Sequence, residues 1–312
     1  MNNSTLDLWR RLLKEDKTAT FFQTPEWHGL ASQFFGTETT VKIFTFGNKT
    51  ALLPLQKKNG FFGSFYSSPF GTYNSLLVDH HLEVDEINHI KKQLVNTNLV
   101  LTSSPFTQNP IQIGNAKALS TKVIELDQIN SENPSLSWNR NHRRKLNEGL
   151  QNNIKIRLAE SENDIHYYYL LYQKLSAEWG SAARVLYPEK LFTLLWSSLK
   201  KSNKMKIWIA EKEGKIVAGR ICFYHGFHAV EWHAASTGEF QKKGVNHLLI
   251  NTILGDAKKN GFQIYDFNPN PGLSQVDHFK MGFHPKILTF STSMNFQKLY
   301  AWIHRLRNTI GN

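Results

Sequence analysis

The chain has 312 residues, of which 40% are hydrophobic and 20% charged, an ordinary globular composition long enough for two domains. Its one cysteine, Cys222, excludes an internal disulfide and a metal site built from several thiolates. The net charge of +12 favours a polyanionic partner, namely nucleic acid, an anionic membrane face or a phosphorylated ligand. No apolar run is long enough to span a bilayer, and the first residues do not resemble a signal peptide. We therefore expect a cytoplasmic protein without stable membrane insertion.

The first half of the chain mixes helices with a hairpin. Thr24 before Pro25 is a typical helix start, and the turn residues at 47–49 separate two runs of strand-forming residues. The predicted helices cover residues 6–13, 25–35 and 83–95, and the predicted strands cover residues 41–46, 50–56, 99–103 and 122–126. Ser, Asn and Pro cluster at residues 130–137, which predicts a linker. This linker divides the chain into an N-terminal domain, residues 1–135, and a C-terminal domain, residues 137–291.

The second half alternates helices with strand-rich segments. One helix follows a capping-box-like start at residues 161–164, and another ends at Asn260-Gly261. Amphipathic stripes predict helices at residues 165–179, 188–199, 245–257 and 277–281. Runs of strand formers predict strands at residues 153–159, 205–211, 215–224, 228–235, 263–267 and 287–291.

Four segments of the second half resemble one known family. They are residues 137–146 (SWNRNHRRKL), 215–220 (KIVAGR), 261–267 (GFQIYDF) and 278–283 (HFKMGF). These segments and the order of the elements are similar to those of GNAT acyltransferases of the FemAB and BioF2-like groups. The resemblance implies an α/β protein with two tandem GNAT-type domains, each a mixed central sheet flanked by helices. It also implies that the N-terminal domain is a degenerate copy, joined by a C-terminal helix within residues 294–312.

The resemblance implies acyl transfer from an activated donor to an amine. In this fold two neighbouring strands part, here residues 228–235 and 263–267, and they leave backbone donors free beside the gap. A backbone amide near Ser236 is then expected to hydrogen-bond the donor carbonyl and polarise it.

Residues 241–246 (QKKGVN) resemble the GNAT pyrophosphate loop, Gln/Arg-x-x-Gly-x-Gly/Ala. Free amides at a helix start bind phosphate, and a glycine allows close approach. The expected cofactor-binding residues are therefore Gln241, Lys242, Lys243, Gly244 and Asn246, with acyl-CoA as co-substrate. Asn246 stands where the family has Gly or Ala, so its side chain either crowds the pyrophosphate or hydrogen-bonds it. A plain helix start with two solvated lysines is the alternative interpretation.

Three side chains join Ser236 as candidate catalytic groups. The lysine of the Phe-Lys-x-x-Phe signature faces the active site in FemAB-like enzymes, so the resemblance implies that Lys280 holds a phosphate or neutralises an oxyanion. A surface lysine on a short helix is the alternative. Asp266 could accept the proton of the amine or cap the loop that follows it. Glu231 and His233 alternate on a strand and are expected to share one face, where Glu231 could act as a base; a structural strand histidine is the alternative interpretation.

Arg140, Arg143 and Arg144 are spaced to share one helical face. Guanidinium groups bind phosphates, so we predict that this face grips the acceptor, a tRNA or coenzyme A; a solvated helix face is the alternative. The 13 histidines have no ligand-like spacing, so no metal site is expected.

The sequence as a whole predicts an N-acyltransferase that forms a ternary complex. The retained Gln241 and Gly244 favour acyl-CoA over aminoacyl-tRNA as donor, and the acceptor would be a small molecule or a cell-envelope precursor. Two alternatives stay open. One is a tRNA-dependent peptidoglycan ligase of the FemAB type, and the other is a non-catalytic module that binds RNA or an anionic surface. The acyl group, the acceptor and the oligomeric state are not determined by the sequence.

Overall fold

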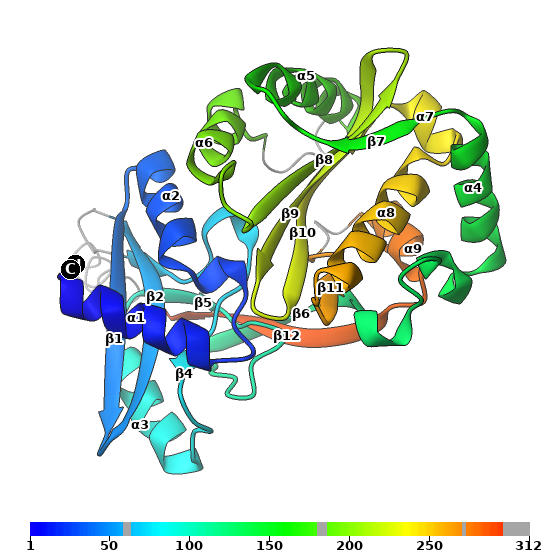
Figure 1. Cartoon of the computed structure of the whole chain (residues 1–312). Coiled ribbons are helices and arrows are strands. Elements are labelled where there is room, and N and C mark those ends of the chain that lie inside the picture. The colour runs from blue at the N-terminus through cyan, green and yellow to red at the C-terminus, as the bar shows by residue number, and fades with distance from the viewer. Residues whose placement is uncertain (59–63, 180–185, 270–272, 296–312) are drawn as a thin grey trace, which may run out of the picture. The chain divides into compact units, whose positions relative to one another are not determined.

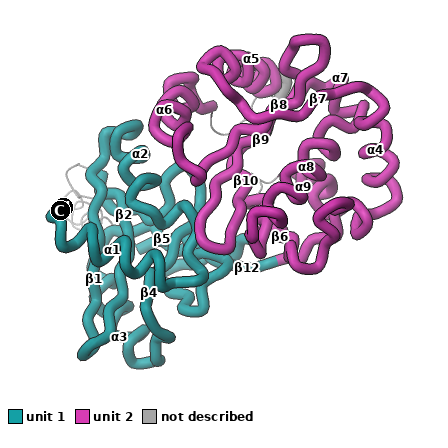
Figure 2. Tube along the Cα trace, viewed as in Figure 1, with its two compact units in different colours: residues 1–120, 288–312 teal, residues 121–287 magenta. Residues whose placement is uncertain are grey.

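The computed structural model describes residues 1–58, 64–179, 186–269 and 273–295, which form two compact units. Unit 1 comprises Met1–Ser120 and Leu288–Asn312, and unit 2 comprises Thr121–Ile287 (Figure 2). The chain passes between the units within strands β6 (Asn115–Glu125) and β12 (Lys286–Asn295). The helix expected near the C-terminus, residues 296–307, lies outside the described residues.

Unit 1 is built on a mixed sheet in the order β1-β2-β3-β5-β12, with β4 paired to β2. Its elements are α1 (Asn3–Glu15), 3₁₀ turn Phe21–Gln23, α2 (Pro25–Phe35), β1 (Glu38–Phe46), β2 (Lys49–Lys58), β3 (Ser64–Tyr66), 3₁₀ turn Pro69–Gly71, β4 (Leu77–Val78), α3 (Val84–Leu94) and β5 (Leu99–Thr102). The predicted cap is confirmed, because the Thr24 hydroxyl accepts a hydrogen bond from the Trp27 amide at 3.2 Å. The predicted hairpin is confirmed as β1 and β2. Strands β3 and β4 were not predicted from the sequence, because they are too short to have a periodic pattern.

Unit 2 is built on both parallel and antiparallel strands, in the order β6-β11-β10-β9-β8-β7 (Figure 1). Its other elements are 3₁₀ turns Leu126–Gln128 and Pro134–Ser137, α4 (Arg140–Gln151), β7 (Lys155–Leu158), α5 (Glu162–Trp179), α6 (Glu189–Leu199), β8 (Met205–Lys212), β9 (Lys215–His225), β10 (His228–Ser236), α7 (Gly238–Lys242), α8 (Val245–Lys259), β11 (Ile264–Asp266) and α9 (Ser274–Met281). The predicted capping box is confirmed: Ser161 and Asp164 exchange two hydrogen bonds of 3.2 Å between side chain and backbone.

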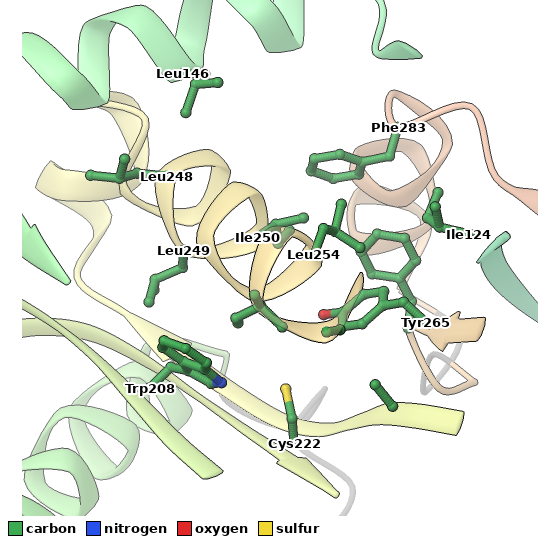
Figure 3. Close-up of a cluster of buried hydrophobic side chains, with 14 of the residues drawn as sticks. Ile124, Leu146, Trp208, Cys222, Leu248, Leu249, Ile250, Leu254, Tyr265 and Phe283 are labelled. Carbon is green, nitrogen blue, oxygen red and sulfur yellow. The ribbon is translucent and has the colours of Figure 1, made fainter. Parts of the chain in front are cut away.

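The core of unit 2 lies between its sheet and α8. The apolar stripe of α8, including Leu249 and Ile253, packs on strand residues such as Cys222 and Tyr265 (Figure 3). Leu146 of α4 belongs to the same cluster. Helices α5 and α6 cover the opposite face of this sheet (Figure 1). Among the helices that the structure describes, none has the length and hydropathy required to cross a membrane.

Candidate active site

Strands β10 and β11 part within unit 2. They run parallel and pair over three residues, from His228 with Ile264 to Val230 with Asp266. Strand β11 ends at Asp266, whereas β10 continues to Ser236 along β9. The predicted separation of these two strands is therefore present, and Ser236 lies at the far end of the separated part of β10.

A β-bulge interrupts β10 between Glu231 and His233. Glu231 lies on the α8 face, where its carboxylate pairs with Arg220. Trp232 and His233 both lie on the other face, with ring centroids 6.3 Å and 5.1 Å from that of Phe192. The prediction that Glu231 and His233 share one face is wrong, because the extra residue of a bulge breaks the two-residue alternation of a strand.

A buried polar network crosses four elements beside the point where the strands part. The phenol of Tyr265 on β11 donates to Glu231 at 2.5 Å, and Arg220 on β9 donates to the same carboxylate oxygen. Arg220 also donates to Asn246 of α8 at 3.2 Å, and Asn246 donates to the Ser236 hydroxyl at 3.0 Å. Arg220 and Glu231 are only 4% and 6% exposed. Although burial disfavours its charge, the Glu231 carboxylate holds the pKa of Arg220 above the usual value.

Lys280 lies at the carboxyl end of β11 and is only 6% exposed, so the surface-lysine alternative is wrong. Its ammonium donates to the carbonyls of Phe267 and Asn268 at 2.9 and 2.7 Å. Burial lowers its pKa from 10.5 to about 8, although Glu231 and Asp266 oppose this shift. An ammonium has three donors, so these two carbonyls leave one donor for a substrate oxygen.

Asp266 is fully buried at the end of β11. Its carboxylate accepts hydrogen bonds from the Thr121 hydroxyl at 2.5 Å and from the Asn268 amide at 2.9 Å. The second contact closes a turn within the loop, which is the capping role stated above as the alternative for Asp266. Its role as a proton acceptor stays a prediction.

Four of the six residues of the candidate phosphate loop are helical. Gln241 and Lys242 belong to α7, which was not predicted from the sequence, and Val245 and Asn246 belong to α8. Gly244 has a φ of +81°, and a Cβ there would lie 1.9 Å from the carbonyl oxygen of Lys145 on α4. The ammonium of Lys145 also donates to the Lys242 carbonyl at 2.7 Å. Close packing of α4 therefore already requires a glycine at position 244. Gln241 donates to the Ser236 carbonyl at 3.1 Å, and Lys243 pairs with Glu239.

Helix α4 presents its arginines to solvent. Arg140, Arg143 and Arg144 are exposed, whereas His142 and Leu146 are buried. The exposure fits the solvated-face alternative and leaves the guanidinium groups accessible to a phosphate. Within the described ranges, no group of three or more His, Cys, Asp or Glu side chains is suited to a metal ion.

Unit 1 contains a similar pair of parallel strands, but side chains fill the place where they would part. Strands β3 and β5 pair in parallel, with α3 between them in the chain. The Thr102 amide of β5 donates to the Ser67 hydroxyl at 3.0 Å, and the Thr102 carbonyl accepts from the Asn74 amide at 2.9 Å. The Asn74 side chain donates to the Ser67 carbonyl at 2.7 Å. These bonds use backbone groups that lie just beyond Tyr66 and Val100, the last paired residues of β3 and β5.

Comparison with known proteins agrees with this geometry. Residues 137–281 match the model of the acetyltransferase (GNAT) domain family. The crystal structure of FemX superposes with a TM-score of 0.69 at 13% identity, covering 97% of this chain and 99% of FemX. A conserved protein of unknown function from Bacteroides thetaiotaomicron superposes with a TM-score of 0.59 at 9% identity. The match covers 93% of this chain and 96% of that protein. The C-terminal domain of a putative lysylphosphatidylglycerol synthetase from Agrobacterium fabrum superposes with a TM-score of 0.53 at 11% identity. The match covers 95% of this chain and 93% of that domain. A search of curated proteins finds no match.

The parted strands of unit 2 and the match over residues 137–281 define a GNAT domain. The match is confined to residues 137–281, and over nearly its whole length the chain has the fold of FemX.

Proposed function

We propose that this protein is an N-acyltransferase that moves an acyl group from an activated donor to an amine. The observation that carries the proposal is the buried Lys280 at the end of β11, beside the point where β10 and β11 separate. An amide of the separated part of β10, near Ser236, would hydrogen-bond the donor carbonyl. The remaining N–H of Lys280 would stabilise the oxyanion that forms when the amine attacks. Binding both substrates side by side supplies much of the remaining acceleration.

Acyl-CoA is the donor that we favour. Gln241 and Gly244 of the loop are retained, and Lys242 and Lys243 add positive charge at the start of α8. The pyrophosphate would lie on the first turn of α8. A specific observation favours aminoacyl-tRNA as the second candidate: Asn246 already bonds Arg220 and Ser236, and the Lys145 carbonyl covers the open side of Gly244.

The acceptor is proposed to be an amine on a small molecule or a cell-envelope precursor. The exposed arginines of α4 would hold its phosphates, or those of a tRNA. This part of the proposal depends on guanidinium chemistry and on the net charge of +12.

Parallel transfer assays test the proposal. The full chain is incubated with labelled acetyl-CoA, a long-chain acyl-CoA or aminoacyl-tRNA, each with a panel of amines, and mass spectrometry detects the amide product. We expect one donor class to yield product and Lys280→Ala to abolish most of it. Binding of tRNA that is insensitive to its aminoacyl group, with no amide formed from any donor, would instead support the non-catalytic module.

A further inference from the structure

Asn268 follows β11 and has its backbone in an unusual conformation. Its φ is +58°, in the left-handed region that L-residues rarely adopt, although asparagine tolerates it better than most. The backbone is held on both sides: its amide donates to Asp266 at 2.9 Å, and its carbonyl accepts from Lys280 at 2.7 Å. Neither of these two contacts uses the side chain of Asn268.

The side-chain oxygen of Asn268 is buried and has no hydrogen-bond partner in the described part of the chain. Leaving a buried carbonyl oxygen without a donor costs about 1–3 kcal/mol. Glycine would adopt the same φ without strain and would remove this buried oxygen. The observed residue therefore has two costs that glycine would avoid, and costs of this kind concentrate at functional sites.

The position of Asn268 indicates what its oxygen binds. It needs a donor, and it lies in the loop that holds Lys280 at the end of β11, where the acyl carbonyl is proposed to lie. A charged ammonium group would be repelled by Lys280, whereas a neutral amine would not. The neutral amine is also the form whose lone pair can attack a carbonyl.

We propose that the side-chain oxygen of Asn268 accepts a hydrogen bond from the acceptor amine and orients its nitrogen for attack. The lone pair of the nitrogen forms the new bond to the acyl carbon, and the bond from that carbon to the donor's sulfur or oxygen breaks. The nitrogen loses a proton, and the departing sulfur or oxygen takes one up. This inference rests on the proposed acyl transfer and adds a residue that contacts the acceptor.

Steady-state kinetics of Asn268→Gly tests the inference, with acetyl-CoA or alanyl-tRNA as donor and spermidine, glucosamine or a lysine-containing peptide as acceptor. Glycine relieves the backbone strain, so the variant should be at least as stable as the wild type. We expect kcat/KM for the amine to fall at least tenfold, while KM for the donor changes less than twofold. Asn268→Asp keeps an accepting oxygen and should retain more activity than Asn268→Gly.

Asn153 provides a matched control, because it is an exposed asparagine of unit 2 with a φ of +50°. Asn153→Gly should leave kcat/KM for the amine unchanged. A wild-type value of kcat/KM in Asn268→Gly overturns the inference and leaves the acyl transfer intact. A wild-type protein that transfers no acyl group to any of these amines overturns the proposed function, and the inference fails with it.

Discussion

Glu231 and Tyr265 are joined by a 2.5 Å hydrogen bond next to Val230 and Asp266, the last paired residues of β10 and β11. The next residues of β10 enter the bulge, and β11 ends one residue after Tyr265. Arg220 extends the same network to Asn246 at the start of α8. The network therefore links the strands and the helix that surround the proposed donor site.

Removing the charge of Glu231 from this network should destabilise unit 2 strongly. Glu231→Gln leaves the buried Arg220 without its counter-charge, and we expect a loss of about 3–5 kcal/mol in the free energy of unfolding, measured by urea denaturation. Replacing both partners, Arg220→Met with Glu231→Leu, should recover most of that loss. Glu213→Gln is the control, because its side chain is 81% exposed and should change stability by less than about 0.5 kcal/mol. A Glu231→Gln variant as stable as this control would contradict the assignment.

Lys280→Met should lower kcat by about 10²-fold, because it removes the donor proposed for the oxyanion. The pKa of about 8 adds a pH dependence: only the ammonium form donates with a full charge, so activity should fall as the pH rises through about 8. Lys280→Arg keeps its charge and should lack this alkaline decline. Lys201→Met replaces an exposed lysine of unit 2 and should retain wild-type rates. A Lys280→Met variant with an unchanged kcat would remove Lys280 from the site.

The sequence predicted long elements well and local geometry poorly. Helix α8 was predicted because its apolar stripe persists for four turns, and the cap at Ser161 because capping is a local interaction. The bulge that separates Glu231 from His233 leaves no trace in a two-residue alternation, because it is set by pairing with β9. Arg220 was not predicted to be part of the site. A single arginine within the apolar run of β9 was the available signal, but only the fold identifies Glu231 as its partner.

Local geometry also explains Gly244. The sequence motif predicted that this glycine allows phosphate binding, but the structure shows that glycine is also required for α4 to pack closely against it. Gly244→Ala should destabilise the protein by more than about 1 kcal/mol, because alanine is strained at a φ of +81° and its Cβ would collide with the Lys145 carbonyl. Gly238→Ala is the matched control: nothing lies within 4 Å of its Cβ position, and it starts a helix. Thermal unfolding of both variants measures the difference. Equal midpoints would mean that α4 does not pack on Gly244 as described.

A buried histidine pair should make the protein sensitive to acid. The rings of His142 on α4 and His247 on α8 lie 4.5 Å apart, and both nitrogens of His247 lack a hydrogen-bond partner among the described residues. Burial, with help from the nearby charges of Arg220 and Lys145, lowers the pKa of His247 from 6.5 to about 3. Between those two pH values the unfolded chain binds a proton at this position that the folded chain does not bind.

The free energy of unfolding should therefore fall as the pH drops below 6.5, by up to about 1.4 kcal/mol per pH unit for His247 alone. His247→Leu cannot bind that proton, so its stability should decline less steeply between pH 6 and 4 in urea titrations. His81→Leu, at an exposed position of unit 1, should keep the wild-type slope. Equal slopes for wild type and His247→Leu would show that this imidazole is protonated in the folded protein, which requires solvent to reach the space between α4 and α8.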